Sequence, residues 1–441
     1  MTPLVAIVGR PNVGKSTLFN RLAGQDLAIV HDEPGVTRDR HYADAHVHGR
    51  DVTLIDTGGF DPTETDAIGR GIARHVEAAI EEADAILCVL DGTASPTPAD
   101  REAVALLRRT KKPVLYVANK ADNANKALLA NDLYTLGVDE LFPVSAAHGR
   151  GFAELEAALV ARLPPISDPT EKPDPETPHV AILGRPNAGK STLFNRFAGE
   201  ERSLVDARPG TTVDPVDTVV EIGGKRSVLV DTAGVRRKSK VASAVETQSV
   251  MRAIRAVGRA DVVVLLCDAT GTVAEQDARL LGLVAGRGRA VVVGLSKADL
   301  LDAEQKKKAV EEARTSLHFA PWASVVMLSS RTGEGIAELE RAILAASESY
   351  RKRVPTAALN RFFADVLEKH PPPTHGGKSP RLYYVTQAEI APPVFVVMCN
   401  TPEAVKTSYR RFVTNQIRKT FSFESVPVIV HFRGKQKKDA P

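Results

Sequence analysis

The feature that most constrains this chain is an internal duplication. The octapeptide from Gly9 to Ser16 returns, with one residue changed, as the octapeptide from Gly184 to Ser191. Three further motifs repeat in the same order, with residues 34–37 returning at 209–212, 56–59 at 231–234 and 119–122 at 296–299. Four motifs that keep nearly one spacing predict two copies of the same domain.

Short apolar runs alternate with helical stretches in each copy. In the first copy these runs are Leu4–Val8, Val52–Ile55, Ala85–Leu90, Val114–Ala118 and Leu141–Val144. Such runs are typical of buried parallel strands, so the sequence predicts an α/β fold with a mostly parallel sheet and helices on both faces. The repeated motifs follow the strands, where open α/β sheets bind ligands.

Proline and charge divide the chain further. We expect a first domain over 1–163, a proline-rich acidic linker over 164–178, a second domain over 179–352, a small α+β domain over 353–434 and a basic tail over 435–441. In the third domain we predict a helix around Leu359, strands near 381–388, 393–399 and 426–432, and a second helix with Thr401 as its N-cap.

Charge and cysteine content narrow the class of protein. The chain has 441 residues and a net charge of +4, but residues 351–441 hold 16 Lys and Arg against 6 Asp and Glu, a net of +10. This basic end either binds a polyanion or is a solvated face. Cys88, Cys267 and Cys399 each lie in an apolar run and predict reduced core residues. We find no apolar run long enough for a membrane span and no signal peptide, and expect a soluble cytoplasmic protein.

The first repeated motif is a phosphate-binding loop. Its glycines let backbone N–H groups turn around phosphate oxygens ahead of a helix N-terminus. We expect Lys15 and Lys190 to reach the β and γ phosphates and act in catalysis, and Ser16 and Ser191 to bind Mg²⁺.

The second and third motifs sense the γ-phosphate. Thr37 and Thr212 are predicted to complete the Mg²⁺ shell and so to act in catalysis, with Asp56 and Asp231 in the outer shell. Loops that only the γ-phosphate orders make a switch.

The fourth motif selects the base. Asp122 and Asp299 can each accept the two hydrogen bonds that guanine N1–H and N2–H₂ donate and adenine does not. We therefore expect GTP or GDP as the ligand. The residues predicted to bind nucleotide in the first copy are Gly9, Arg10, Pro11, Asn12, Val13, Gly14, Lys15, Ser16, Thr17, Asp56, Thr57, Gly58, Gly59, Asn119, Lys120, Asp122, Ser145 and Ala146. In the second copy they are Gly184, Arg185, Pro186, Asn187, Ala188, Gly189, Lys190, Ser191, Thr192, Asp231, Thr232, Ala233, Gly234, Ser296, Lys297, Asp299 and Ser329.

With two guanine-nucleotide domains followed by a small basic domain, the whole chain resembles the Der (EngA) family of bacterial GTPases. The motifs Arg381–Gln387, Pro392–Phe395 and Asn415-Gln416 add to the resemblance. It implies two tandem P-loop GTPase domains and a KH-like third domain. The implied activity is GTP hydrolysis with a slow intrinsic rate, in assembly of the large (50S) ribosomal subunit. The implied partner is that subunit or its precursor, through rRNA, with a free protein that is a monomer and binds no membrane.

The chain departs from GTPase patterns at several positions. Phe60 and Val235 stand where Ras-like enzymes have a water-orienting glutamine, so either the sites hydrolyse GTP slowly or another group stabilises the charge. The resemblance favours a K⁺ ion held by Asn12 and Asn187. Ser296 stands where the family has Asn, which predicts weaker nucleotide binding at the second site. Val213 departs from the family at a loop position.

The contribution of the third domain leaves two functions open. It lacks the G-x-x-G clamp of KH domains, so direct RNA reading and a docking role are equally open. Lys406, Arg410 and Arg418 lie at helical spacing and are the predicted RNA contacts, and the basic run 236–240 is either solvated or a contact that depends on nucleotide state. We expect a GTP-hydrolysing switch that controls pre-ribosome binding, or alternatively an RNA-docking module in which one or both nucleotide sites are structural.

Overall fold

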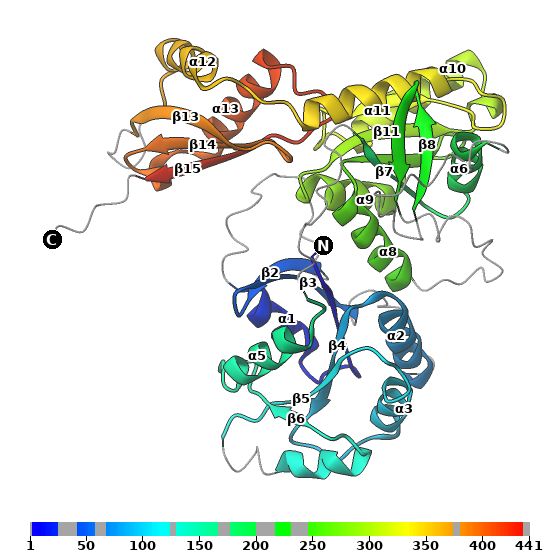
Figure 1. Cartoon of the computed structure of the whole chain (residues 1–441), viewed down its shortest axis with the longest axis vertical. Helices are drawn as coiled ribbons and strands as arrows, with labels where there is room; N and C mark the ends of the chain where they lie inside the picture. Colours follow the sequence, from blue (N-terminus) through cyan, green and yellow to red (C-terminus); the bar gives the residue numbers. More distant parts are fainter. Residues whose placement is uncertain are drawn as a thin grey trace, which may run out of the picture. The chain divides into compact units, whose positions relative to one another are not determined.

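A computed structural model gives the structure of this chain. It describes residues 2–24, 42–57, 68–123, 129–165, 177–199, 217–230, 246–373 and 380–434. These residues form three sheets, each with its own helices (Figure 1). The described residues up to 165, together with residues 246–258 of helix α8 (Glu246–Arg259), form one compact unit, and the second and third sheets belong to another.

The first sheet has the strand order β2-β3-β1-β4-β5-β6. Its strands are β1 (Leu4–Val8), β2 (Tyr42–Val47), β3 (Arg50–Asp56), β4 (Ala85–Asp91), β5 (Val114–Asn119) and β6 (Leu141–Pro143). All neighbours pair in parallel except β2 with β3. The predicted apolar runs are confirmed as strands, while the antiparallel edge strand β2 was not predicted.

Helices cover both faces of the first sheet (Figure 1). They are α1 (Lys15–Ala23), α2 (Ile68–Glu82), α3 (Pro98–Leu107), α5 (Phe152–Arg162) and the 3₁₀ helix η3 (Ala130–Leu136). Alternate side chains of β1 point to opposite faces, so that Val5 and Ile7 join Leu18 of α1 and Leu155 of α5 in one core. Packing in this core fixes β1, β4 and β5, so that their carboxyl ends lie at the same edge of the sheet.

The second sheet repeats this topology with the order β8-β9-β7-β10-β11-β12. Its strands are β7 (His179–Gly184), β8 (Thr218–Ile222), β9 (Lys225–Leu229), β10 (Val262–Asp268), β11 (Ala290–Ser296) and β12 (Ser324–Met327). Its helices are α6 (Lys190–Ala198), α9 (Glu275–Gly286), α10 (Ala303–Ser316), α11 (Ile336–Tyr350) and the 3₁₀ helix η5 (Ala298–Leu300). The predicted domain duplication is therefore visible in the strand order itself.

The third sheet has the order β13-β14-β15, antiparallel and then parallel. Its elements are α12 (Thr356–Lys369), β13 (Leu382–Glu389), β14 (Val394–Cys399), the 3₁₀ helix η6 (Pro402–Ala404), α13 (Thr407–Thr420) and β15 (Ile429–Gly434). Thr401 does not cap the second helix as predicted. Pro402 starts only a 3₁₀ turn, Val405 is extended, and α13 begins after Lys406.

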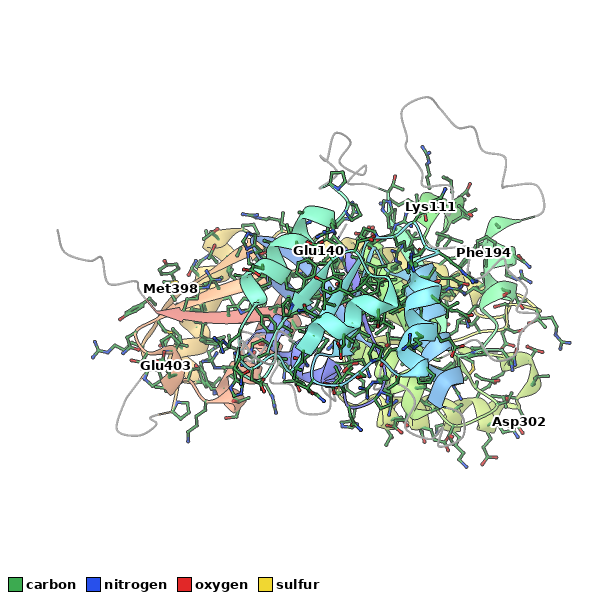
Figure 2. The ribbon with its side chains drawn as sticks, turned by 90° about the horizontal axis from the view of Figure 1, so that it is seen from below. Lys111, Glu140, Phe194, Asp302, Met398 and Glu403 are labelled. Carbon is green, nitrogen blue, oxygen red and sulfur yellow. The ribbon has the colours of Figure 1, made fainter. Side chains whose placement is uncertain are left out.

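Burial agrees with the expected distribution of side chains. Phe194 of α6 is buried, whereas Lys111, Glu140 and Asp302 are exposed (Figure 2). The three cysteines are buried and unpaired, and burial raises the pKa of the Cys88 thiol to about 12, so it stays protonated at neutral pH. In the part of the chain that the structure describes, no helix is long and apolar enough to cross a membrane.

Candidate guanine-nucleotide sites

The phosphate loop of each copy turns sharply between a strand and a helix. Gly9 and Gly184 have φ values of 147° and 145°, and a Cβ at either position would lie 2.4 or 2.3 Å from a backbone carbonyl oxygen of the neighbouring strand. Gly14 and Gly189, at φ 91° and 94°, start α1 and α6. Only glycine suits these positions, so the loop holds its N–H groups close to a bound phosphate.

The loop lysines lie inside these turns. The Lys15 ammonium donates to the carbonyl of Arg10 at 2.9 Å, and the Lys190 ammonium donates to the carbonyls of Gly184 and Arg185 at 2.7 Å each. Burial lowers the pKa of both lysines below the ordinary value. A phosphate that accepts from the ammonium stabilises its charged form, which favours anion binding at this point.

The first copy brings together two of the predicted Mg²⁺ groups. The Ser16 hydroxyl donates to the Asp56 carboxylate at 2.6 Å, beside the N-terminus of α1. Thr57 donates its hydroxyl to the carbonyl of Ile7 at 2.9 Å and fixes the end of β3. An oxygen-rich pair next to a phosphate loop fits Mg²⁺, which prefers oxygen ligands and phosphate.

Several predicted residues lie outside the part of the chain described by the structure. They are Thr37, Gly58, Gly59, Phe60, Thr212, Val213, Asp231, Thr232, Ala233, Gly234, Val235 and the basic run 236–240. Ser191 and Thr192 are described and exposed at the start of α6. Asn12 and Asn187 are exposed too, with left-handed φ values of 66° and 64°.

The base motif of the first copy is tied to the phosphate loop. The Asn119 amide donates to the carbonyl of Val13 at 2.8 Å and accepts from the N–H of Ala146 at 3.0 Å. The Ser145 hydroxyl donates to Asp122 at 2.7 Å and orients its carboxylate. Ser145 and Ala146, which follow β6, are therefore tied to the base motif.

The base motif of the second copy has different partners. Ser296 donates its hydroxyl to the carbonyl of Cys267 at 3.1 Å, on the neighbouring strand rather than on the phosphate loop. Ser329 donates to one oxygen of Asp299, and Arg331 donates to the other. Hydrogen bonds from Ser329 first and Arg331 second lower the pKa of Asp299, so the carboxylate is charged at neutral pH.

An ionic connection between the phosphate loop and the base motif was not predicted from the sequence. In the first copy, Arg10 pairs with Asp100 at 3.2 Å and with Asp91 at 3.7 Å, and Asp91 pairs with Lys120 at 2.7 Å. Burial alone would raise the pKa of Asp91, but hydrogen bonds from Lys120 and Thr93 lower it.

The second copy repeats this connection through other carboxylates. There Arg185 pairs with Asp277 at 2.9 Å, and Lys297 pairs with Asp268. Asp91 and Asp100 recur as Asp268 and Asp277 in the same register as the base motif. That recurrence is the sequence signal that identifies them.

The predicted RNA contacts have different surroundings. Lys406 is exposed ahead of α13. Arg410 donates to the carbonyls of Val405 and Pro402, and its guanidinium lies 4.9 Å from the centre of the Phe432 ring. Arg418 lies 6.0 Å from the centre of the Trp322 ring.

Comparison with known proteins agrees with this geometry. Residues 4–120 and 179–297 match a family described as 50S ribosome-binding GTPase, and residues 353–433 match the C-terminal KH-like domain of EngA bacterial GTPase enzymes. A GTPase Der from Salinispora tropica is 45% identical over 99% of this chain and 92% of the relative, and one from Myxococcus xanthus is 44% identical over 99% and 96%.

A solved structure of Era, in complex with MgGDPNP and nucleotides 1506–1542 of 16S ribosomal RNA, is 21% identical. The match covers 74% of this chain and 92% of the Era chain, with a TM-score of 0.30. Two phosphate loops, two guanine motifs and full-length identity above 40% agree on one assignment. The chain belongs to the Der (EngA) family of GTPases, which bind and hydrolyse GTP.

Proposed function

We propose that this GTPase acts in the cytoplasm in assembly of the large (50S) ribosomal subunit, and that its nucleotide state controls its binding to the rRNA of the subunit precursor. The description of the family that both nucleotide domains match, 50S ribosome-binding GTPase, supports this proposal. The observation that carries it is the net charge of +10 over residues 351–441, on a chain whose first 350 residues carry a net charge of −6. A basic domain attracts phosphate backbones over a wide range of sequences.

The residues of each site have separate tasks in hydrolysis. Lys15 and Lys190 hold the β and γ phosphates, and Asp122 and Asp299 hold guanine. Ser16, beside Asp56, and Ser191 would bind Mg²⁺ together with Thr37 and Thr212. Bound Mg²⁺ neutralises charge on the β and γ phosphates.

Stimulation by K⁺ is part of the proposal. Asn12 and Asn187 are exposed on the phosphate loops and offer amide oxygens there. A monovalent cation held at this point would supply the charge stabilisation that an arginine finger supplies in other GTPases.

The RNA contacts are proposed on α13 of the C-terminal domain. Lys406, Arg410 and Arg418 remain the proposed contacts, and Lys406 tests them best because its side chain is exposed and has no structural role in the described part. Removing one phosphate contact makes the slope of log affinity against log salt shallower by about 0.7 to 0.9. Lys406→Gln should reduce the slope by that amount, whereas Glu403→Gln, on the exposed acidic side of η6, should not reduce it.

Cosedimentation of the monomeric full chain with large-subunit particles tests the switch. Binding under GDP should differ from binding under a non-hydrolysable GTP analogue. A double variant, Asp122→Asn with Asp299→Asn, should lose this difference with guanine nucleotides and recover it with xanthine nucleotides, because the amide donates to the additional carbonyl oxygen. Equal binding in both nucleotide states would favour the alternative function, an RNA-docking module.

A further inference from the structure

The two nucleotide sites differ in how the base motif is joined to the phosphate loop. In the first copy the Asn119 side chain, 3% exposed, bridges the carbonyl of Val13 and the N–H of Ala146. A Cβ placed on Gly14 would lie only 2.3 Å from the Asn119 amide nitrogen. The amide is thus packed directly against the phosphate loop, and a single side chain joins this loop to the base motif.

The same place in the second copy holds a shorter side chain at the position of Asn119. Ser296 replaces Asn119, and its hydroxyl donates away from the loop, to Cys267. A Cβ placed on Gly189 would lie 3.8 and 3.9 Å from the Cβ and Oγ of Ser296, which is ordinary contact distance. The carbonyl of Ala188 and the N–H of Ser330 are the counterparts of the groups that Asn119 bridges, and the Ser296 side chain does not bridge them.

A second substitution accompanies the first. Ser330 replaces Ala146, and its side chain is buried, with the residue 8% exposed. Among the described residues, its hydroxyl has no hydrogen-bond partner. A buried hydroxyl without a partner destabilises the folded state, because the group loses its hydrogen bonds to water. The position thus adds a polar group in the same place where the amide of the first copy is replaced.

Together these groups have the chemistry of a buried water site. A buried water makes about three hydrogen bonds to polar groups that protein atoms leave unsatisfied. The Ser296 oxygen and the Ala188 carbonyl can accept, the Ser330 N–H can donate, and the Ser330 hydroxyl can do either. An amide is bulkier than the hydroxyl that replaces it, which gives a water room at this position.

We propose that Ser330 is a positioning residue of the second guanine site, and that with Ser296 and the Ala188 carbonyl it binds one buried water that replaces the asparagine amide. The base motif and the phosphate loop of the second site are then joined through a water instead of a side chain. Guanine-nucleotide affinity depends on Ser330 in the second site, whereas it depends on Asn119 in the first. This inference concerns nucleotide binding and does not depend on a ribosomal partner.

The test uses the full chain with Asp122→Asn, which turns the first site toward xanthine nucleotides so that GDP reports the second site. Ser330→Ala should accelerate GDP release about fivefold, the factor that corresponds to one net hydrogen bond. In a Ser296→Asn background, the same Ser330→Ala change should have no effect, because the asparagine amide takes the place of the water. This non-additivity separates positioning through residue 296 from a merely structural role.

The first site provides the matched control, read with GDP in an Asp299→Asn background. Asn119→Ser should accelerate GDP release, Ala146→Ser alone should bring no gain, and the two together should recover part of the loss. Unchanged GDP release in Ser330→Ala would overturn the proposal, as would an equal effect of that change with and without Ser296→Asn. A crystal structure of the GDP complex that lacks water between Ser296 and Ser330 would overturn it too.

Discussion

Replacement of Asp100 by Asn tests whether the ionic connection holds the phosphate loop in its active shape. Asp100 is 4% exposed and accepts from the Arg10 guanidinium at 3.2 Å and from the N–H and hydroxyl of Thr97 at 3.0 and 2.7 Å. The asparagine oxygen can keep the Thr97 contacts, so the start of α3 stays capped. The ion pair with Arg10 is removed. Because the Arg10 carbonyl accepts from the Lys15 ammonium, a displaced Arg10 shifts the lysine that holds the phosphates.

The size of the effect follows from burial. Removal of one partner of a fully buried ion pair costs about 3 to 5 kcal/mol. Arg10 is 21% exposed and keeps Asp91 at 3.7 Å, so we expect about 1.5 kcal/mol at the first site, or roughly tenfold faster GDP release.

The second copy supplies a graded comparison. Asp277 is 0% exposed, and in the described part of the chain it is the one carboxylate that pairs with Arg185. Asp277→Asn should therefore accelerate GDP release from the second site more than Asp100→Asn does from the first. Release from each site is measured by stopped-flow fluorescence, with the other site redirected to xanthine nucleotides. Unchanged release in both variants would refute the reasoning, and so would the opposite order.

Three further perturbations test other parts of the structure. GTP turnover should rise when K⁺ replaces Na⁺ at fixed ionic strength. Asn12→Gly, which keeps the left-handed backbone, should abolish the first site's share of that rise. Equal rates in the two salts would contradict a K⁺ role. Arg331→Ala should tighten GDP binding at the second site about two- to threefold at low salt and less at high salt, because Arg331 competes with guanine for Asp299; calorimetry that shows weaker binding would contradict this. Burial would raise the pKa of Asp261, but His179 and Arg351 lower it below 3.8, so its protonation favours unfolding: the stabilisation is complete above about pH 4 and is lost as the pH falls through the folded-state pKa. Asp261→Asn should reduce the decrease in the thermal unfolding midpoint as the pH falls through the acid range. An unchanged decrease would show that other carboxylates cause it.

The sequence predicted the elements whose signal is local. Apart from Asp91 and Asn119 at the ends of β4 and β5, the strands β1, β4 and β5 are apolar and almost fully buried, so their identity follows from composition alone. The edge strand β2 alternates buried and exposed residues and has no continuous apolar run, and its pairing with β3 is a tertiary property. The N-cap prediction at Thr401 failed for a related reason. A cap followed by proline specifies the start of a turn but does not determine whether the chain continues into a helix, and Val405 interrupts it.

The same distinction separates the parts of the site. The phosphate loop was predictable because its glycines and lysine carry the chemistry at fixed spacing within one segment. The partners of Arg10 were not predictable from a segment, because Asp91 and Asp100 reach the loop only through the parallel packing of β4 beside β1 and the placement of α3. The proposed water between Ser296 and Ser330 likewise joins two segments that are far apart in the sequence, at the ends of the neighbouring strands β11 and β12.

Comparison of the two copies shows where one GTPase domain tolerates change. Both keep a loop lysine bonded to a loop carbonyl, an arginine paired with a buried carboxylate, and a base-motif lysine paired with an aspartate at the end of the central strand. One described difference lies at the base motif and the segment that contacts it, where Asn119 and Ala146 become Ser296 and Ser330.

The γ-phosphate reacts in hydrolysis, whereas the base is the same in GTP and GDP and takes no part in the reaction. A change confined to the base side therefore alters exchange without altering the chemistry of hydrolysis. We expect the second site, where Ser296 and Ser330 replace Asn119 and Ala146, to release nucleotide at a different rate from the first site.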